Sequence, residues 1–491
     1  MLSMQAFAYD LYIDGIYYNA NATKNTLVVT HGENEYTGTI NIPSTIEYKG
    51  RTLTVIGIGK EAFKNSAIRE VKLSNTIESI ESHAFENCEN LQGIEFNDNL
   101  TTIGDSTFFG CKGIKRIKLG NTTSIGEYSF YDCTNLEDVQ LGNIRSIGCS
   151  AFRRCSKLKE LVIPITTKTI ENFAFAYSGL ERLVILGEEK SNNLTFDNSK
   201  YDLFQESCDI NTFLATHLQY IYLGRNLKIG DAREMSLFRE LPIKKIEISD
   251  NVTNLPSNFF GGIDSLDTIT IPSSVKSLFQ SDFQLRYSYS PTQYPKKINN
   301  LIFKDSMNNP LYVTDEFGFS LYGDFYLGRD LDCYKRHWFY ANDVYIGKYV
   351  TTLKNISLYA NDRIITYATV PPTNASFSNS TYLNTQLYVP KGCLEVYKNA
   401  DGWKNFWNIE EFDTSSTDEI EANSAHATID ANAITISGLK DGEVAYAYSL
   451  TGRLLGTAKS QQGKAIINHN TSKNEVVLVK TINHCWKIMA N

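Results

Sequence analysis

The histidines are the side chains best suited to acid–base chemistry near neutral pH, because their usual pKa is about 6.5. The chain has 7 of them, and no pair has the HExxH spacing of a zinc protease. The sequence also lacks a GxSxG nucleophile elbow and a phosphate-binding P-loop. His83 falls at a variable position of a repeat, where a surface residue is expected. A triad assembled from distant parts of the chain would escape this search, but the sequence predicts that the protein is not an enzyme.

Two other sites contain residue types that could do chemistry. Cys149 would need a neighbouring base to act as a nucleophile, and no histidine is tied to it in the sequence. Asp330 and Asp332 could bind calcium, but two acids fall short of the roughly six to eight oxygens that this ion takes. We therefore expect a spare core or surface thiol at Cys149, and neither a metal nor a cofactor in this protein.

Composition narrows the class of protein. Hydrophobic residues make up 42% of the 491 residues and charged residues 21%, which is typical of a folded chain. The net charge of -8 leaves no basic footprint for nucleic acid. No apolar run reaches the roughly 18 residues of a transmembrane helix. The 29 tyrosines and 26 phenylalanines suit β-rich structure, and also binding surfaces.

The first eight residues resemble the end of a signal peptide. Ala6-Phe7-Ala8 matches the small-x-small pattern of a signal-peptide cleavage site, although the preceding charged and apolar regions are missing. The alternatives are a methionine placed on a trimmed signal peptide, a true start further upstream, or an ordinary N-terminus. We interpret residues 1–8 as a signal-peptide remnant and expect an exported protein, either on the cell surface (outer membrane) or secreted.

A repeat of 22 or 23 residues is the strongest pattern in the chain. Five residues before each repeat phenylalanine stands an isoleucine, and after it comes an apolar-x-x-apolar-x-apolar triplet. The repeat phenylalanines are Phe63, Phe85, Phe108, Phe130, Phe152 and Phe175. The last two members of a triplet alternate with the period of a strand, and so they face the same side. One coil cannot bury its apolar faces alone, whereas stacked coils close a continuous core.

Four of the 9 cysteines follow the same period. Each stands three residues after a repeat phenylalanine; they are Cys88, Cys111, Cys133 and Cys155. This placement predicts a buried column of free thiols that act as small hydrophobic residues. Disulfides between neighbouring coils, or a metal ladder, are the alternatives.

The repeat resembles the BspA-like leucine-rich repeats, also called the Treponema pallidum type. The resemblance rests on segments such as SIESHAFENCENLQGIEF (79–96), SIGEYSFYDCTNLEDVQL (124–141) and SIGCSAFRRCSKLKELVIP (146–164). With weaker copies it covers about residues 10–412. The family includes surface proteins that bind host extracellular-matrix proteins. The resemblance therefore implies a leucine-rich-repeat solenoid that binds a protein partner, with a glycan-capturing or structural envelope protein as the alternative. We expect a monomer.

The pattern divides the chain into successive segments. Asp14-Gly15 predicts a hairpin turn in the first of them. The expected segments are an N-terminal β cap (9–55), regular repeats (56–186), degenerate repeats with insertions (187–368), a C-terminal cap (369–412), a linker (413–422) and a small all-β, Ig-like domain (423–491). Within the degenerate repeats, 187–216 is interpreted as an insertion, and 284–297 and 305–342 as loops. In the C-terminal cap the expected core plugs are Leu394, Tyr397, Trp403, Phe406 and Trp407.

The last segment has two possible roles. Tyr448-Ser-Leu-Thr-Gly452 resembles the Y-x-L-x-G of C-terminal sorting domains used by type IX secretion. Those domains usually also carry Gly-x-Tyr before a final strand, and here Asn474-Glu475-Val476 stands in its place. An Ig-like accessory module is the alternative.

Residues between the apolar triplet positions must point away from the solenoid core. In the middle coils these include four hydrophobic residues: Val162, Val184, Tyr220 and Tyr222. Either the insertion 187–216 covers them, or β propensity alone selected them, or they form a docking patch for a partner. Trp338 and Tyr340, in the expected loop HWFY, are a second candidate for binding.

Overall fold

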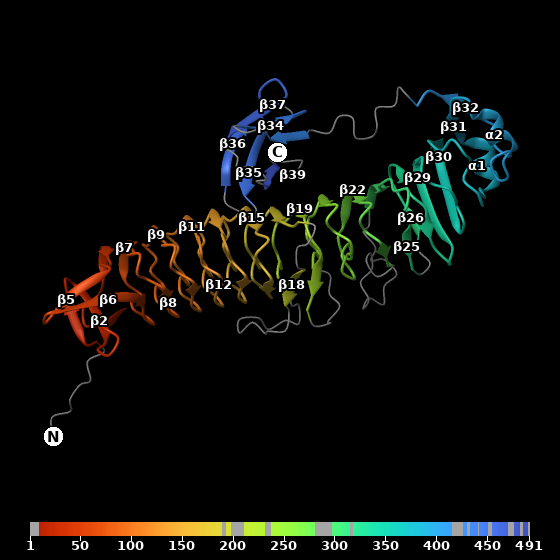
Figure 1. Cartoon of the computed structure of the whole chain (residues 1–491). Coiled ribbons are helices and arrows are strands. Elements are labelled where there is room, and N and C mark those ends of the chain that lie inside the picture. The colour runs from red at the N-terminus through yellow and green to blue at the C-terminus, as the bar shows by residue number, and fades with distance from the viewer. Residues whose placement is uncertain are drawn as a thin grey trace.

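The chain forms an elongated stack of coils with a smaller unit beside it (Figure 1). The computed structural model describes residues 9–188, 193–197, 211–230, 237–279, 297–314, 318–414, 426–429, 433–439, 441–449, 454–469, 476–481 and 485–489. The described residues wind into a parallel β-solenoid of about 14 turns with almost no helix. The solenoid predicted from the repeat is therefore confirmed, with turns in place of short helices in its regular coils.

One side of the solenoid is a 12-stranded sheet. Half of its strands contain the isoleucine that precedes a repeat phenylalanine. Its parallel register places Ile80, Ile103, Ile125, Ile147 and Ile170 in one row. The strands are β1 (Leu11–Ile13), β2 (Ile16–Asn21), β3 (Thr26–Thr30), β5 (Thr45–Tyr48), β6 (Arg51–Ile58), β8 (Ser79–Ile80), β10 (Thr102–Ile103), β12 (Ser124–Ile125), β14 (Ser146–Ile147), β16 (Thr169–Glu171), β18 (Leu194–Asp197) and β20 (Leu227–Ile229). At its start, β1 and β2 pair antiparallel and form the expected hairpin at Asp14-Gly15.

The opposite side carries the strands of the apolar triplets, which also pair in parallel. Its first strands are β4 (Thr37–Asn41), β7 (Ala67–Lys72), β9 (Gly93–Glu95), β11 (Arg116–Lys118) and β13 (Asp138–Gln140). A second 12-stranded sheet follows, with β15 (Glu160–Ile163), β17 (Arg182–Ile185), β19 (Tyr220–Leu223), β21 (Lys245–Ile248), β22 (Ser265–Ile271), β24 (Lys297–Phe303), β26 (Gly318–Ser320), β27 (Phe325–Leu327), β29 (His337–Ile346), β30 (Ile356–Thr366), β31 (Gln386–Pro390) and β32 (Ile409–Phe412). A small sheet of β23 (Ser277–Leu278), β25 (Leu311–Val313) and β28 (Leu331–Asp332) completes the solenoid.

The repeat phenylalanines stack through the middle of the solenoid. Ring centroids are 5.0 Å apart between Phe63 and Phe85, and 5.8 Å apart between Phe152 and Phe175. All six rings are at most 1% exposed. The column continues to Phe213, whose ring lies 5.6 Å from that of Phe175, beyond the regular repeats. A large apolar ring on every coil thus gives each coil a neighbour to pack against on both sides.

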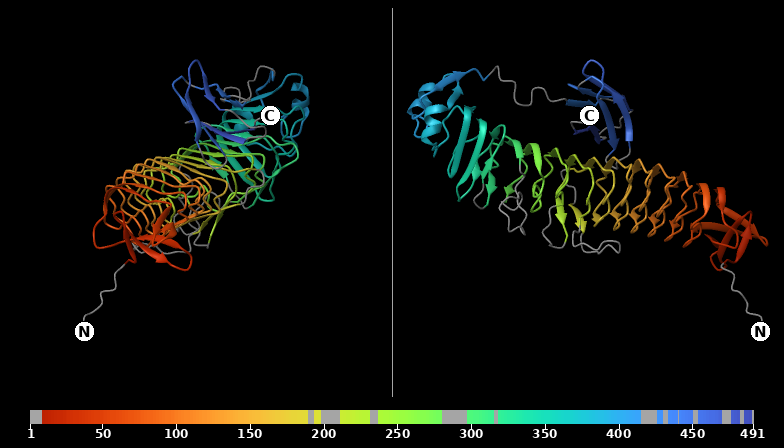
Figure 2. Two further views of the ribbon diagram at one scale, coloured as in Figure 1. Left: turned by 60° about the vertical axis from the view of Figure 1, so that its left-hand side comes forward. Right: turned by 180° about the vertical axis from the view of Figure 1, so that it is seen from behind.

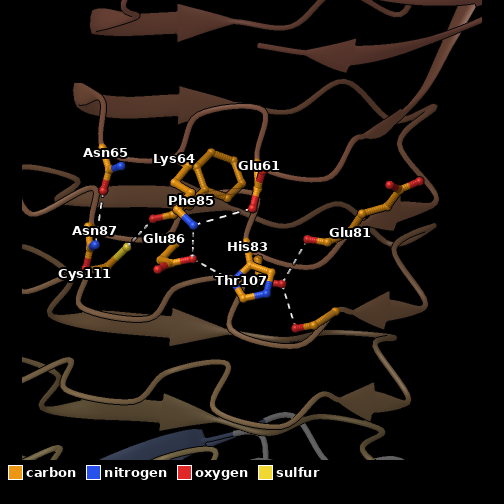
Figure 3. A network of polar contacts seen from close by, with 11 residues as sticks. Glu61, Lys64, Asn65, Glu81, His83, Phe85, Glu86, Asn87, Thr107 and Cys111 are labelled. Atoms are coloured by element: carbon orange, nitrogen blue, oxygen red, sulfur yellow. Dashed lines mark hydrogen bonds and ion pairs between the residues drawn. The ribbon is translucent and has the colours of Figure 1, made fainter. Parts of the chain in front are cut away.

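The turn after each repeat phenylalanine needs left-handed backbone. Asn65, Asn87, Gly110 and Asp132 occupy equivalent positions and have φ between 58° and 70°. Glycine, asparagine and aspartate tolerate this region better than other residues. The Asn87 side chain also donates to Asn65 Oδ1 at 3.1 Å, and so the turns of neighbouring coils are tied together (Figure 3).

The far end of the solenoid contains the two α-helices of the described residues, α1 (Asn379–Asn384) and α2 (Leu394–Asn399). Tyr397 and Trp403 are fully buried there, and Trp403 Nε1 donates to the carbonyl of Pro372 at 2.8 Å. Phe406 is buried against them. Trp407 was expected to join this plug, but that prediction is wrong, because its side chain is 78% exposed.

The described residues between 426 and 489, here called the C-terminal unit, form two small sheets. One holds β33 (His426–Ile429), β34 (Ala433–Ser437) and β37 (Lys464–Asn468); the other holds β35 (Val444–Ser449), β36 (Leu454–Lys459), β38 (Val476–Lys480) and β39 (Cys485–Met489). Residues of both sheets share a core separate from that of the solenoid, including Ile434, Ile467, Ala447 and Val477. The unit is all-β, while its Ig-like classification stays a prediction.

Two expectations about irregular segments were wrong where the structure describes them. The expected insertion 187–216 contains β18, which pairs with β16 and β20 and so continues the first sheet. The expected loop 305–342 contains β25 to β28 and the start of β29. Both strand sets depend on pairing with neighbouring coils, which a local pattern does not reveal. Residues 1–8 and 284–296, and most of the expected linker 413–422, lie outside the described residues.

Candidate binding surfaces

The column cysteines are part of the core, not a reactive site. The four are all buried, and each thiol donates to the carbonyl of a repeat phenylalanine on the preceding coil. The distance is 2.9 Å from Cys88 Sγ to Phe63 O. It is 3.0 Å from Cys111 Sγ to Phe85 O, the contact that Figure 3 shows. Burial raises the pKa of the Cys88 thiol to about 11, and it also raises the pKa of the Cys111 thiol well above its usual range. Neutral thiols of this kind are poor nucleophiles and poor metal ligands.

The other residues considered for chemistry are buried or make hydrogen bonds that stabilise the fold. Cys149 is buried, and Asp330 accepts hydrogen bonds from the backbone N–H groups of Thr351 and Thr352 at 2.7 and 3.1 Å. The His83 Nδ1 lies 2.6 Å from Glu86 Oε2 in a surface network with Lys64 (Figure 3). Within the described ranges, no cluster of three or more potential ligands could hold a metal ion.

The predicted patch of Val162, Val184, Tyr220 and Tyr222 lies on the outer face of β15, β17 and β19. These side chains form a cluster with Leu186 that is separate from the solenoid core, as their outward orientation requires. The three interpretations of the sequence left open whether these side chains are covered, and in the structure they are only 2–7% exposed. They do not form an open docking surface.

The C-terminal unit covers this patch. Tyr448, on β35, packs against the cluster, and its hydroxyl lies 3.4 Å from Glu160 Oε1. Arg182 Nη2 donates to the carbonyl of Thr481 at 2.5 Å, and its guanidinium lies 3.6 Å from the centre of the Tyr220 ring. Figures 1 and 2 agree that the unit lies beside the middle coils, well away from the solenoid end to which it is joined. This contact was not predicted from the sequence, because its two sides are almost 300 residues apart.

The second candidate, Trp338 and Tyr340, lies on strand β29 and not in a loop as expected. Strand pairing places Tyr340 opposite Ser320 of β26 on one side and Tyr359 of β30 on the other. The rings of Tyr340 and Tyr359 stack at 4.1 Å with an interplanar angle of 7°, and Trp338 meets Tyr340 edge-on at 5.7 Å. Trp338 is 36% exposed and Tyr340 45%. We call Trp338, Tyr340 and Tyr359 the aromatic strip.

The position of Trp338 depends on the glycine beside it. A Cβ atom added to Gly318 would lie 2.0 Å from the indole ring, so only glycine lets the ring lie flat against the neighbouring strand. The sequence analysis missed Tyr359. The signal was present, because YAND at residues 340–343 recurs as YAND at 359–362.

Ion pairing and amide contacts fix the backbone next to the aromatic strip. Asp343 is buried and accepts from Arg363 Nε at 3.1 Å through both carboxylate oxygens. Hydrogen bonding to Asp343 raises the pKa of Arg363, so the guanidinium group stays charged. Asn361 donates to Asn342 Oδ1 at 3.2 Å across the same two strands. The strip is therefore a preformed surface on rigid strands.

The coil architecture defines a leucine-rich-repeat solenoid protein. The family model described as a BspA type leucine rich repeat region matches residues 56–181 and 192–309, in six copies. The chain belongs to the BspA-type leucine-rich-repeat family. Members of this family are typically surface or secreted proteins.

Several crystal structures resemble this chain. A leucine-rich repeat protein from Bacteroides ovatus is 22% identical, covering 63% of this chain and 95% of its own, with a TM-score of 0.31. A leucine rich cell surface protein from Faecalibacterium prausnitzii is 20% identical, with 61% and 96% covered and a TM-score of 0.33. The T. pallidum leucine rich repeat protein is 25% identical, with 35% and 81% covered and a TM-score of 0.33. No curated protein matches the chain. In the part of the chain described, no helix is long and apolar enough to cross a membrane.

Proposed function

We propose that this chain is an exported scaffold that binds a protein partner, such as a host extracellular-matrix protein, through the aromatic strip. The observation that carries the proposal is the exposure of Trp338 and Tyr340 on paired strands, beside the stacked ring of Tyr359. Tryptophan and tyrosine are the side chains that contribute most often to binding hot spots in protein interfaces. The scaffold itself does no chemistry in this proposal.

The geometry of the strip favours a protein over a sugar. The stack at 4.1 Å covers one face of both tyrosine rings, so fewer open ring faces are left for a sugar. Sugar rings bind to open aromatic faces, whereas ring edges and hydroxyls can pack against side chains and bond to peptide groups. Strand pairing on both sides of β29 also limits the conformational entropy that ordering these side chains would cost.

The test is a binding assay with the full chain against a panel of purified extracellular-matrix proteins and a glycan array. We expect at least one matrix protein to bind, and the Trp338→Ala/Tyr340→Ala double variant to bind it at least about 30-fold more weakly, as hot-spot losses of about 2 kcal/mol or more imply. Tyr312→Ala and Tyr334→Ala are matched controls, because both remove an exposed tyrosine elsewhere on the solenoid.

Other outcomes would select the alternatives. Undiminished matrix binding by the double variant would remove the aromatic strip from the proposal. Glycan binding that depends on Trp338, without binding to any matrix protein, would support a carbohydrate-capturing protein. Concentration-dependent self-association with no ligand would support a structural envelope protein.

A further inference from the structure

The patch under the C-terminal unit is built like a docking surface. Val162, Val184 and Tyr222 are paired in one row across β15, β17 and β19, and Glu160, Arg182 and Tyr220 in the next. The patch thus has an apolar row beside a row with charged residues. Protein–protein interfaces are arranged in the same way, with a hydrophobic centre and a polar rim. Without a cover, these hydrophobic side chains would lie on the outer face of the sheet, where they contribute nothing to the solenoid core.

The face of the C-terminal unit that contacts the patch offers it both an apolar ring and polar groups. On β35, Ala445 and Ala447 point into the unit's own core, so Tyr448 lies on the opposite, outer face. Tyr448 packs against the patch, and within its own unit its ring stacks with that of Tyr446 at 6.4 Å. Glu160 and Arg182 supply polar contacts to the Tyr448 hydroxyl and the Thr481 carbonyl.

The contact joins parts of the solenoid and the C-terminal unit that do not follow one another in the chain. In the sheet order, eight strand steps separate β19 from β32, the last strand of the solenoid, a distance on the order of 38 Å at about 4.8 Å per step. The solenoid and the C-terminal unit each have a hydrophobic core of their own, so the unit is held on the patch by the contacts described above and not by a shared core.

We propose that the C-terminal unit is a releasable cover, and that the patch is its intramolecular docking site through Tyr448 and Thr481. The occupied patch is a second surface, distinct from the aromatic strip, so the proposal goes beyond the function given above. Release of the unit exposes two valines and two tyrosines on the outer face of adjacent strands. The covered and uncovered states then differ in the binding surface that the chain presents.

Small-angle X-ray scattering and hydroxyl-radical footprinting of the full chain test this proposal. Tyr448→Ala and Arg182→Ala remove one contact from each side of the interface. We expect both variants to have a larger radius of gyration than the natural chain, and Tyr220 and Tyr222 to be oxidised several-fold faster. Ile466→Ala is the control, because it removes an exposed hydrophobic side chain from the other sheet of the C-terminal unit.

The two variants make the outcome decisive. Arg182 belongs to the solenoid, so its replacement tests the contact even if Tyr448→Ala unfolds the C-terminal unit. An unchanged radius and unchanged oxidation in Arg182→Ala, with Tyr448→Ala either unchanged or unfolded by circular dichroism, would overturn the proposal. Rapid oxidation of Tyr220 and Tyr222 in the natural chain would do so as well.

Discussion

Each column cysteine occupies a position where a small side chain must fill space and donate one hydrogen bond. Cys133 and Cys155 both donate to phenylalanine carbonyls at 3.2 Å, as Cys88 and Cys111 do at shorter distances. The four column cysteines have free thiols. The predicted alternatives of disulfides between coils or a metal ladder find no support among these residues.

The raised pKa of the column thiols predicts slow labelling in the folded protein. At pH 8 we expect Cys111 and Cys133 to react with iodoacetamide at least about 100-fold more slowly than in denaturant, because burial both blocks access and suppresses the thiolate. Mass spectrometry of the labelled peptides measures this rate for each site. Labelling of these two cysteines at the denatured rate would contradict the buried column.

The same pKa shift sets a limit on stability at high pH. The Cys88 thiol has a pKa of about 11 in the folded protein, against about 8.5 for an unperturbed thiol. The contribution of the Cys88 thiol to the free energy of unfolding is therefore fully present below about pH 8.5, and it is lost as pH rises through 11. Denaturant titrations at several pH values should show a falling free energy of unfolding across this window. Cys88→Ala should reduce the slope, and an unchanged slope would contradict the linkage.

Two buried arginines show how a recurring string acquires a role only in the folded chain. YLGRN at 222–226 and YLGRD at 326–330 are visible in the sequence. Arg225 donates to the carbonyls of Pro164 and Ile165, and Arg329 donates to those of Pro272 and Ser273. Burial lowers the pKa of both guanidinium groups to about 10. Each arginine thus binds a turn two coils earlier, across the strand in between.

At the scale of the coil, the stacked phenylalanines are expected to carry most of the packing energy. Phe108→Ala should lower the free energy of unfolding by about 3–5 kcal/mol, because its fully buried ring leaves a cavity between two stacked neighbours. Phe109→Ala is the matched control, since that adjacent ring is half-buried and stacks with Tyr131, outside the phenylalanine column. Urea titration measures both. Equal losses in the two variants would show that the column does not dominate coil stability.

At the scale of the whole molecule, the solenoid and the C-terminal unit have separate hydrophobic cores. Calorimetry should therefore show at least two transitions, because each part buries its own core and the patch cluster that joins them through Tyr448 is much smaller. Ile436→Ala should lower the transition of the C-terminal unit and leave that of the solenoid in place, while Ile246→Ala should do the reverse. One cooperative transition that shifts as a whole in both variants would contradict this independence.

The repeat period alone determined the solenoid, the Phe column and the outward orientation of Val162 and Val184. The repeat period predicts these features because each coil contacts mainly its two neighbouring coils. The position of a residue within the repeat therefore specifies which side chains it packs against. The irregular coils were harder to predict. Strands such as β18 and β25 exist because a neighbouring coil offers an edge to pair with, and the local sequence does not contain that edge.

Only the tertiary structure decided what covers the outward-facing side chains. Tyr448 lies on the patch and Trp338 lies in the open, although both are aromatic residues on outer faces of strands. The difference arises from one contact between two separately folded parts of the chain. That contact follows no repeat, and so it depends on shape and charge complementarity that emerges only after both parts have folded.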